Sequence, residues 1–274
     1  MAHSRRNGLR IYYEVSGEGP AMVLIHANPF DHRLWMYQVA RYSAFYKVIA
    51  VDIRGYGRSD KPETSFTLQD MAQDVLGVCW DEGVDRAIFA GVSVGSGISL
   101  VIGIEHPELA EALILVGGSS RGAAGMHRRI EGFLSDDLPG YQRQHLRDCV
   151  APSFPETAHG AWLLNLFNES ADRLSGRSIA QIFRARLACD LTDRLGDIRA
   201  PTLVVNGEHD MSLEAGRETA SRIPGAVHAI LPGAGHACNI EDPIAFDAEV
   251  VKFLASRGLW RGAPAKFRAS ASER

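Results

Sequence analysis

The sequence predicts an α/β protein with a mostly parallel, doubly wound sheet and a helical segment inserted into the chain. Two observations support this. Short apolar runs, typical of strands buried on both faces, alternate with amphipathic stretches of helical spacing. The alternation stops between about 119 and 197, where the pattern is helical and contains no buried-strand run, and then resumes.

The predicted strands are Leu9–Val15, Ala21–His26, Val48–Val51, Ala87–Ala90, Ala112–Val116, Pro201–Asn206 and Ala226–Leu231. The first of them alternates apolar and polar residues and ends at a turn cluster rich in Gly and Pro. The others are apolar runs, which favour central positions in a parallel sheet.

The predicted helices of the sheet domain are His32–Tyr42, Thr67–Cys79, Gly95–His106, Leu213–Arg222 and Pro243–Leu254. Their apolar residues recur at helical spacing. Thr67 is a candidate N-cap, and Asp70 stands at the spacing of a capping box.

These patterns divide the chain into a core, residues 1–118 and 198–261, and a helical lid, residues 119–197. The alternative for the second part is a set of extra core helices packed on one edge of the sheet. The last residues, 262–274, are rich in Ala, Ser and basic side chains, and we expect a mobile tail there.

Composition excludes several classes of protein. Of the 274 residues, 46% are hydrophobic and 23% charged, and the net charge is −4, so intrinsic disorder and a basic nucleic-acid module are both excluded. The apolar runs are too short to span a membrane. The four cysteines lie far apart, which favours reduced thiols and a cytoplasmic location, and we expect no signal peptide. No metal-ligand spacing is present, so we expect neither a metal nor another cofactor.

The clearest motif is Gly91-Val92-Ser93-Val94-Gly95, which fits G-x-S-x-G. It stands directly between a predicted strand and a predicted helix. A sharp turn at this point exposes the serine hydroxyl and needs small residues on both sides. Ser93 is therefore the candidate nucleophile.

A serine nucleophile needs a base and an acid that orients the base. Asp210 and His236 follow the last two predicted strands, and the carboxyl ends of parallel strands share one edge. We expect His236 to be the general base and Asp210 its partner. Glu208 and His209 compete with Asp210, and His26 is expected to be structural.

A third segment, His26-Ala27-Asn28-Pro29-Phe30, follows the strand at 21–26. A loop here can donate a backbone N–H to an oxyanion, together with the N–H of Val94. Asn28 and Val94 are therefore the predicted oxyanion hole. The alternative is a tight proline loop without a catalytic donor.

These residues together resemble the α/β-hydrolase superfamily, over the chain from Leu9 to about Leu259. The stretch Asp52–Ser59 is similar to the D-x-R-G-x-G-x-S turn of that family, in which Arg54 and Ser59 hold a loop. Gly235–Pro243 is similar to the family's histidine loop, where an acidic residue and a proline start the last helix. The resemblance implies a serine-dependent enzyme with a triad of Ser93, Asp210 and His236.

We expect hydrolysis of a carboxylic ester or lactone through a Ser93 acyl-enzyme, as in small carboxylesterases and enol-lactonases. The His26–Pro29 loop is similar to that of haloalkane dehalogenases, but those enzymes and epoxide hydrolases use an aspartate nucleophile. C–C hydrolases of ring-cleavage diketones remain an alternative, although they often carry Trp where this chain has Ala237. Cofactor-free oxygenase or perhydrolase chemistry and a hydrolase-like ligand receptor are further alternatives.

The expected partner is a small-molecule substrate, with neither nucleic acid nor membrane involved; the oligomeric state is not predicted. Apolar lid residues suggest a substrate with an apolar portion, or they attach the lid to the core; they are Phe133, Trp162, Leu163 and Phe167. Lid arginines could bind a carboxylate, but a solvated outer face is the favoured interpretation; they are Arg128, Arg129, Arg143 and Arg147.

Overall fold

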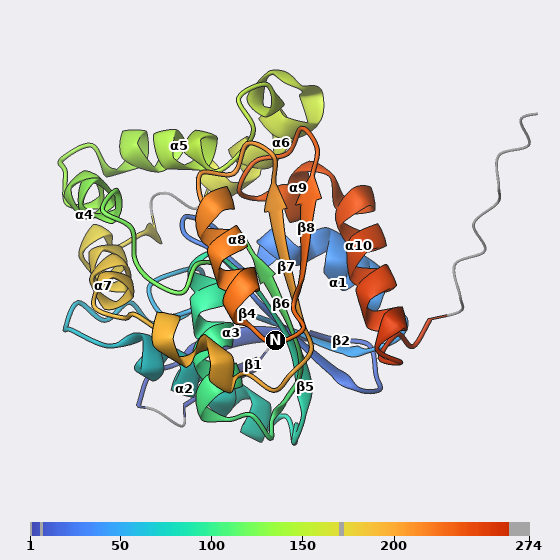
Figure 1. The fold of residues 1–274 in the computed structure, drawn as a ribbon. Coiled ribbons are helices and arrows are strands. Elements are labelled where there is room, and N and C mark those ends of the chain that lie inside the picture. Colours follow the sequence, from blue (N-terminus) through green and yellow to red (C-terminus); the bar gives the residue numbers. More distant parts are fainter. Residues whose placement is uncertain (1, 6–7, 170–172, 263–274) are drawn as a thin grey trace, which may run out of the picture.

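The computed structural model describes residues 2–5, 8–169 and 173–262. In this part of the chain, an eight-stranded sheet has the order β1-β2-β4-β3-β5-β6-β7-β8 (Figure 1). Its strands are β1 (Ala2–Ser4), β2 (Ile11–Ser16), β3 (Ala21–Ile25), β4 (Lys47–Val51), β5 (Ala87–Val92), β6 (Ala110–Val116), β7 (Thr202–Gly207) and β8 (Val227–Leu231). Strands β3 to β8 pair in parallel, whereas β2 is antiparallel to both of its neighbours. The predicted fold class is confirmed.

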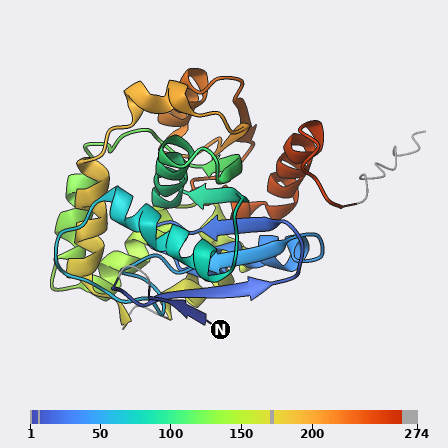
Figure 2. The ribbon, with the colours of Figure 1, turned by 90° about the horizontal axis from the view of Figure 1, so that it is seen from below.

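Helices cover both faces of the sheet. The helices α2 (Leu68–Asp81), α3 (Val94–Glu105) and α8 (Leu213–Arg222) contribute to one apolar cluster, and α1 (Met36–Tyr42) and α10 (Pro243–Ser256) contribute to the other. Figure 2 shows α10, in red, on the opposite side of the molecule from α7, in gold. The sheet therefore has two buried faces, as its apolar strands predict.

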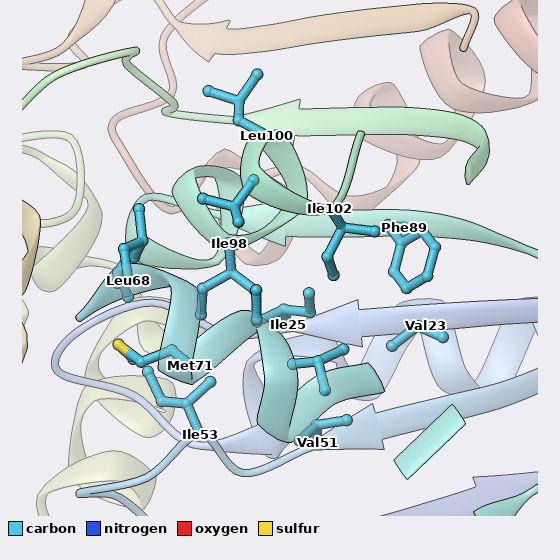
Figure 3. Close-up of a cluster of buried hydrophobic side chains, with 14 of the residues drawn as sticks. Val23, Ile25, Val51, Ile53, Leu68, Met71, Phe89, Ile98, Leu100 and Ile102 are labelled. Carbon is cyan, nitrogen blue, oxygen red and sulfur yellow. The ribbon is translucent and has the colours of Figure 1, made fainter. Parts of the chain in front are cut away.

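Strand side chains alternate between the two clusters. In β3, Val23 and Ile25 face the α2–α3 side, where they lie near Phe89 and Ile98 (Figure 3), and Leu24 faces the other side. Because the central strands, such as β3, β5 and β7, bury both sets of side chains, their register is strongly specified. This register aligns the carboxyl ends of β3, β5, β6, β7 and β8 along one edge.

Local signals in the sequence account for the helix boundaries. Thr67 accepts a hydrogen bond from the Asp70 N–H at 3.1 Å, and Asp70 accepts one from the Thr67 N–H at 2.7 Å, so the predicted capping box is present. The helix expected over 32–42 begins as a 3₁₀ turn, His32–Trp35, and the Asp31 side chain caps it by accepting the Arg33 N–H at 3.0 Å.

A group of helices separates β6 from β7. It consists of α4 (Met126–Phe133), α5 (Leu138–Asp148), the 3₁₀ turn Phe154–Glu156, α6 (Ala158–Asn168), α7 (Gly176–Leu187) and the 3₁₀ turn Thr192–Asp197. Figure 1 shows α5 and α6 at the top and α4 and α7 at the left. At its base, a bridge pairs Arg121 with Asp190, and the buried Arg186 donates hydrogen bonds to the carbonyls of Ser119 and Cys189.

Two further points concern the chain ends and the membrane. The strand β1 was not predicted; it forms by pairing its three residues with β2, and His3 packs against Tyr12 with ring centroids 5.2 Å apart. The tail expected at 262–274 lies outside the described residues, apart from Gly262. Among the described helices, none is long and apolar enough to cross a membrane.

Candidate active site

Ser93 occupies a strained turn between β5 and α3. Its φ of 55° and ψ of −110° make it the one non-glycine residue with positive φ in the described chain. A Cβ on Gly91 would lie 2.2 Å from the Gly95 carbonyl oxygen, and a Cβ on Gly95 would lie 2.3 Å from the Ile25 oxygen. The spacing G-x-S-x-G is thus a steric requirement of this turn.

The loops after β7 and β8 bring Asp210 and His236 together. Asp210 Oδ1 lies 2.7 Å from His236 Nδ1, and both residues are buried. The competing Glu208 points elsewhere, because its carboxylate accepts the Gly233 N–H at 2.9 Å, and the His209 side chain is exposed. Asp210 is therefore the acid that contacts the histidine.

Supporting contacts that the sequence analysis missed hold this pair. The Ser212 N–H and hydroxyl each donate to Asp210 Oδ1 at 2.8 Å, and the Asn206 amide donates to Asp210 Oδ2 at 2.8 Å. Gly117 lies so close to His236 that a Cβ there would be 2.6 Å from the imidazole. Asn206 is the last residue of the predicted strand before the acid, which is the signal that could have revealed it.

Electrostatics favours the charged form of the pair. Burial works to raise the pKa of Asp210, but the His236 charge and the hydrogen bonds outweigh burial, so this pKa lies well below its usual range. For His236 the signs are reversed: burial works to lower its pKa, but the Asp210 charge and hydrogen bond raise the pKa above its ordinary value. An imidazole in this setting accepts a proton readily.

Ser93 and His236 line one cavity of about 330 Å³, which Asn28 also lines. Within the described chain, no hydrogen bond joins the Ser93 hydroxyl to His236. Such contacts often tighten only when a substrate is bound. The Ser93 hydroxyl and the His236 imidazole nevertheless belong to residues that line the same cavity.

The predicted oxyanion hole consists of two backbone N–H groups, those of Asn28 and Val94. Val94 is the first residue of α3, so its N–H is one of the free donors at a helix N-terminus. Asn28 lies in the loop after β3 and is buried, and its N–H has no backbone acceptor among the described residues. Both groups are available to an oxyanion.

Comparison with known proteins identifies the family. The model of the α/β hydrolase fold family matches residues 20–243, which is most of the chain. The chain belongs to the α/β hydrolase fold family. It is an enzyme of that family, and the resemblance drawn from its motifs is confirmed.

Named relatives of this hydrolase include lactonases and esterases. It is 26% identical over 260 residues to 3-oxoadipate enol-lactonase 1 of Acinetobacter baylyi, covering 89% of this chain and 92% of the relative. It is 26% identical to the pimeloyl-[acyl-carrier protein] methyl ester esterase of Yersinia enterocolitica, covering 89% and 97%. The crystal structure of the enol-lactonase from Burkholderia xenovorans LB400 superposes with a TM-score of 0.87 at 27% identity, covering 93% and 100%.

Other residues singled out in the sequence have structural roles in the hydrolase. His26 is completely buried; one ring nitrogen contacts the Ala27 carbonyl at 2.9 Å and the other accepts the Ile53 N–H at 3.0 Å. Arg54 forms a buried ion pair with Asp74 at 2.6 Å. The Ser59 hydroxyl donates to the Asp52 carbonyl and accepts from the Tyr12 N–H. These residues hold loops, as expected.

The apolar residues of the inserted helices that were expected to suggest a substrate do not line the cavity. Phe133, Leu163 and Phe167 are buried in the apolar clusters, and Trp162 is 54% exposed. The alternative, that they attach the inserted helices to the core, is correct for the three buried ones. The apolar part of the cavity wall is formed by Ala123, Met126, Phe183, Met211 and Ala215.

One of the four arginines departs from the expected solvated face. Arg128, Arg143 and Arg147 are exposed, as expected, but Arg129 lines the cavity, and its side chain is only 18% exposed. Helical periodicity explains the difference: neighbouring residues of α4 point about 100° apart, so Arg129 faces inward where Arg128 faces solvent.

Asp31, His32 and Asp52 offer a possible set of metal ligands within 4.8 Å of one another. Hydrogen bonds to other side chains and to the backbone already explain why these three residues lie close together. Asp31 accepts from the Arg33 guanidinium at 2.7 Å, and Asp52 accepts from His32 Nδ1 at 2.7 Å and from the Arg58 N–H at 2.8 Å. Lowering of the Asp52 pKa to about 2, despite burial, reflects its His32 partner.

Proposed function

We propose that this enzyme hydrolyses a carboxylic ester or lactone through a Ser93 acyl-enzyme. The observation that carries the proposal is the 2.7 Å contact between Asp210 and His236, beside a cavity shared with the strained Ser93. In an α/β-hydrolase, a serine on a strained turn, a histidine and an acid in contact with that histidine are the residues of a catalytic triad. The names of the relatives, a lactonase and a methyl esterase, support the same bond class.

Each residue has one role in the proposed reaction. His236 removes the Ser93 proton while the serine oxygen attacks the carbonyl carbon, and Asp210 stabilises the imidazolium that forms. The N–H groups of Asn28 and Val94 bind the oxyanion of the tetrahedral intermediate. His236 then protonates the leaving alkoxide, and in the second half it activates the water that releases the acid.

The inserted helices complete the site. In this proposal, residues 119–197 form the lid of a core made of 1–118 and 198–261, since lid residues supply much of the cavity wall. The substrate is a small molecule, and Met126, Phe183 and Met211 contact its apolar portion. We place the enzyme in the cytoplasm, supported by four cysteines without a disulfide.

The test is hydrolysis of p-nitrophenyl acetate and butyrate by the wild type and by Ser93→Ala. Loss of the nucleophile is expected to lower kcat by about a millionfold. Ser221→Ala, on the exposed surface of α8, is the matched control and keeps the wild-type rate.

A fluorophosphonate probe gives an independent readout. Intact mass should show one adduct on the wild type and on Ser221→Ala and none on Ser93→Ala. Equal ester turnover by the wild type and Ser93→Ala, or labelling that survives the Ser93 substitution, would refute the acyl-enzyme.

A further inference from the structure

One section of the cavity wall is polar and comes from the inserted helices. Arg129 on α4 and His145 on α5 both line the cavity that holds Ser93 and His236. Neither residue belongs to the proposed triad or oxyanion hole. We therefore ask which kind of bound molecule the side chains of Arg129 and His145 could contact.

Arg129 presents a cation to the cavity. Its Nη1 contacts Asp148 Oδ2 at 2.7 Å, but Asp148 does not line the cavity, and its other oxygen accepts the Gln144 amide at 2.7 Å. Arg121 and Glu218 also line the cavity, but they pair with each other at 3.0 Å. Among the described residues that line the cavity, Arg129 is thus a cation whose carboxylate partner, Asp148, does not itself line the cavity.

The Arg129 guanidinium stays charged and keeps donors to spare. Burial lowers its pKa, but the hydrogen bond to Asp148 and the smaller contributions of Cys149 and Tyr141 together outweigh burial and raise the pKa above its ordinary value. A guanidinium carries five N–H donors in a planar fork, which matches the two oxygens of a carboxylate. The contacts with Asp148 and Tyr141 leave other donors available.

His145 adds a neutral donor beside this cation. The residue is 4% exposed, and its Nδ1 has no hydrogen-bond partner among the described residues. It packs against Phe133 and Phe183, with ring centroids 5.5 and 5.9 Å apart. Burial and the charges of Arg129 and His236 hold its pKa well below the ordinary value, so the imidazole is neutral.

The proton of this neutral imidazole belongs on Nε2. A buried N–H without an acceptor is rarer than a buried acceptor without a donor, so the enclosed Nδ1 is better left unprotonated. Nε2–H is then the polar group that His145 offers to the cavity.

We propose that Arg129 and His145 bind a carboxylate carried by the substrate, which is therefore a short ester or lactone with a second, free carboxylate group. This rests on the proposed function. One guanidinium and one neutral imidazole match a singly charged anion better than a phosphate with its higher charge. A cavity of about 330 Å³ fits a compact molecule of this kind.

The test compares methyl hydrogen adipate with dimethyl adipate, which differ in one carboxylate. The wild type is expected to hydrolyse the monoester with the higher kcat/KM. In Arg129→Gln, this preference should fall by about tenfold to about a hundredfold, mainly through KM, because a charge-assisted hydrogen bond is lost. His145→Phe, which fits the aromatic surroundings, should lower it by a smaller factor.

Arg128→Gln is the matched control, since Arg128 is the exposed neighbour of Arg129 on α4 and should keep the wild-type preference. Binding is checked separately by inhibition of p-nitrophenyl acetate hydrolysis. Adipate should inhibit the wild type more strongly than inorganic phosphate does, and Arg129→Gln should lose that inhibition.

The outcomes separate the two proposals. If Arg129→Gln lowers hydrolysis of both esters equally, or if the wild type prefers the diester, the carboxylate site is refuted while Ser93-dependent hydrolysis stands. If phosphate inhibits more strongly than adipate, the anion is not a carboxylate. If Ser93→Ala retains turnover, the proposed function itself fails. Should Arg129→Gln not fold, Arg129→Lys, which keeps the charge without the fork, is expected to show an intermediate preference.

Discussion

Glu241 accepts a hydrogen bond of 2.7 Å from the backbone N–H of Ala151, and this contact ties the inserted helices to the histidine loop. The other Glu241 oxygen accepts the N–H of Gly235 at 2.9 Å. A third bond joins the Ala237 N–H to the Cys149 carbonyl at 2.8 Å. The residues on both sides of His236 are therefore fixed to the inserted segment.

Replacement of Glu241 by Gln should change how stability depends on pH. Burial raises the pKa of Glu241 to about 7, above the value of about 4.3 for an unfolded chain. Between these values the folded state binds more protons than the unfolded state, so the wild type loses stability as pH rises, by a few kcal/mol at most. The Tm of Glu241→Gln minus that of the wild type should therefore increase from pH 5 to pH 8.

This difference is measured by thermal unfolding in buffers of equal ionic strength. Glu214→Gln, whose side chain is 83% exposed, is the control and should show a constant difference. A constant difference for Glu241→Gln as well would contradict the link to burial.

Asp210→Asn should slow the reaction by about ten-thousandfold in kcat, because the histidine loses the acid that orients it and stabilises its cation. It should also move the acid limb of the kcat/KM profile to lower pH. The sign follows from the site: Asp210 raises the pKa of His236, burial lowers it, and without the Asp210 charge burial is the largest influence that remains. Glu208→Gln should keep the wild-type profile, and a profile unchanged in Asp210→Asn would show that Asp210 is not the partner of the catalytic base.

Gly95→Ala should destabilise the enzyme and remove its activity. The new Cβ would lie 2.3 Å from the Ile25 carbonyl oxygen, which is backbone and cannot move without displacing β3. We expect a loss of about 1–3 kcal/mol in the free energy of unfolding, measured by urea denaturation. Gly196→Ala is the control, because no atom lies within 4 Å of its added Cβ; equal effects of the two would refute the steric explanation.

Arg186→Gln should loosen the base of the insertion. The Arg186 guanidinium is buried and donates to the carbonyls of Ser119 and Cys189, which lie on the segments that lead into and out of the inserted helices. Faster hydrogen exchange is expected around 119–125 and 187–191, with the central strands unaffected. Arg184→Gln, exposed on the same helix, should exchange like the wild type; protection unchanged in Arg186→Gln would mean that the contact does not hold the base.

The sheet was predictable because its central strands are apolar on both faces. Such runs have few alternatives to the centre of a parallel sheet, and the paired glycines around Ser93 follow from a turn that excludes any Cβ. The contact between Asp210 and His236 follows from the same topology, since β7 and β8 are neighbours and end at one edge.

The inserted helices were less predictable, because the sequence pattern of a buried aromatic residue does not indicate whether its side chain lines a cavity or packs in the core. Phe133 and Phe183 both lie on these helices and stack at 5.9 Å, yet only Phe183 lines the cavity. The same holds for Arg128 and Arg129, whose orientation depends on how α4 packs against α7. The strand β1 escaped prediction because its three residues are stabilised by pairing with β2 rather than by their own pattern.

The bonds around Glu241 also bear on engineering by exchange of modules. Residues 149–151 are hydrogen-bonded to the loop that carries His236, so a chimera that takes its inserted helices from a relative would replace half of that junction. Crossover points that retain residues 149–151 with their own histidine loop would preserve the position of His236. The helices before residue 149 and after residue 151 could then be taken from a relative, and we expect the substrate preference of that relative to be transferred with them.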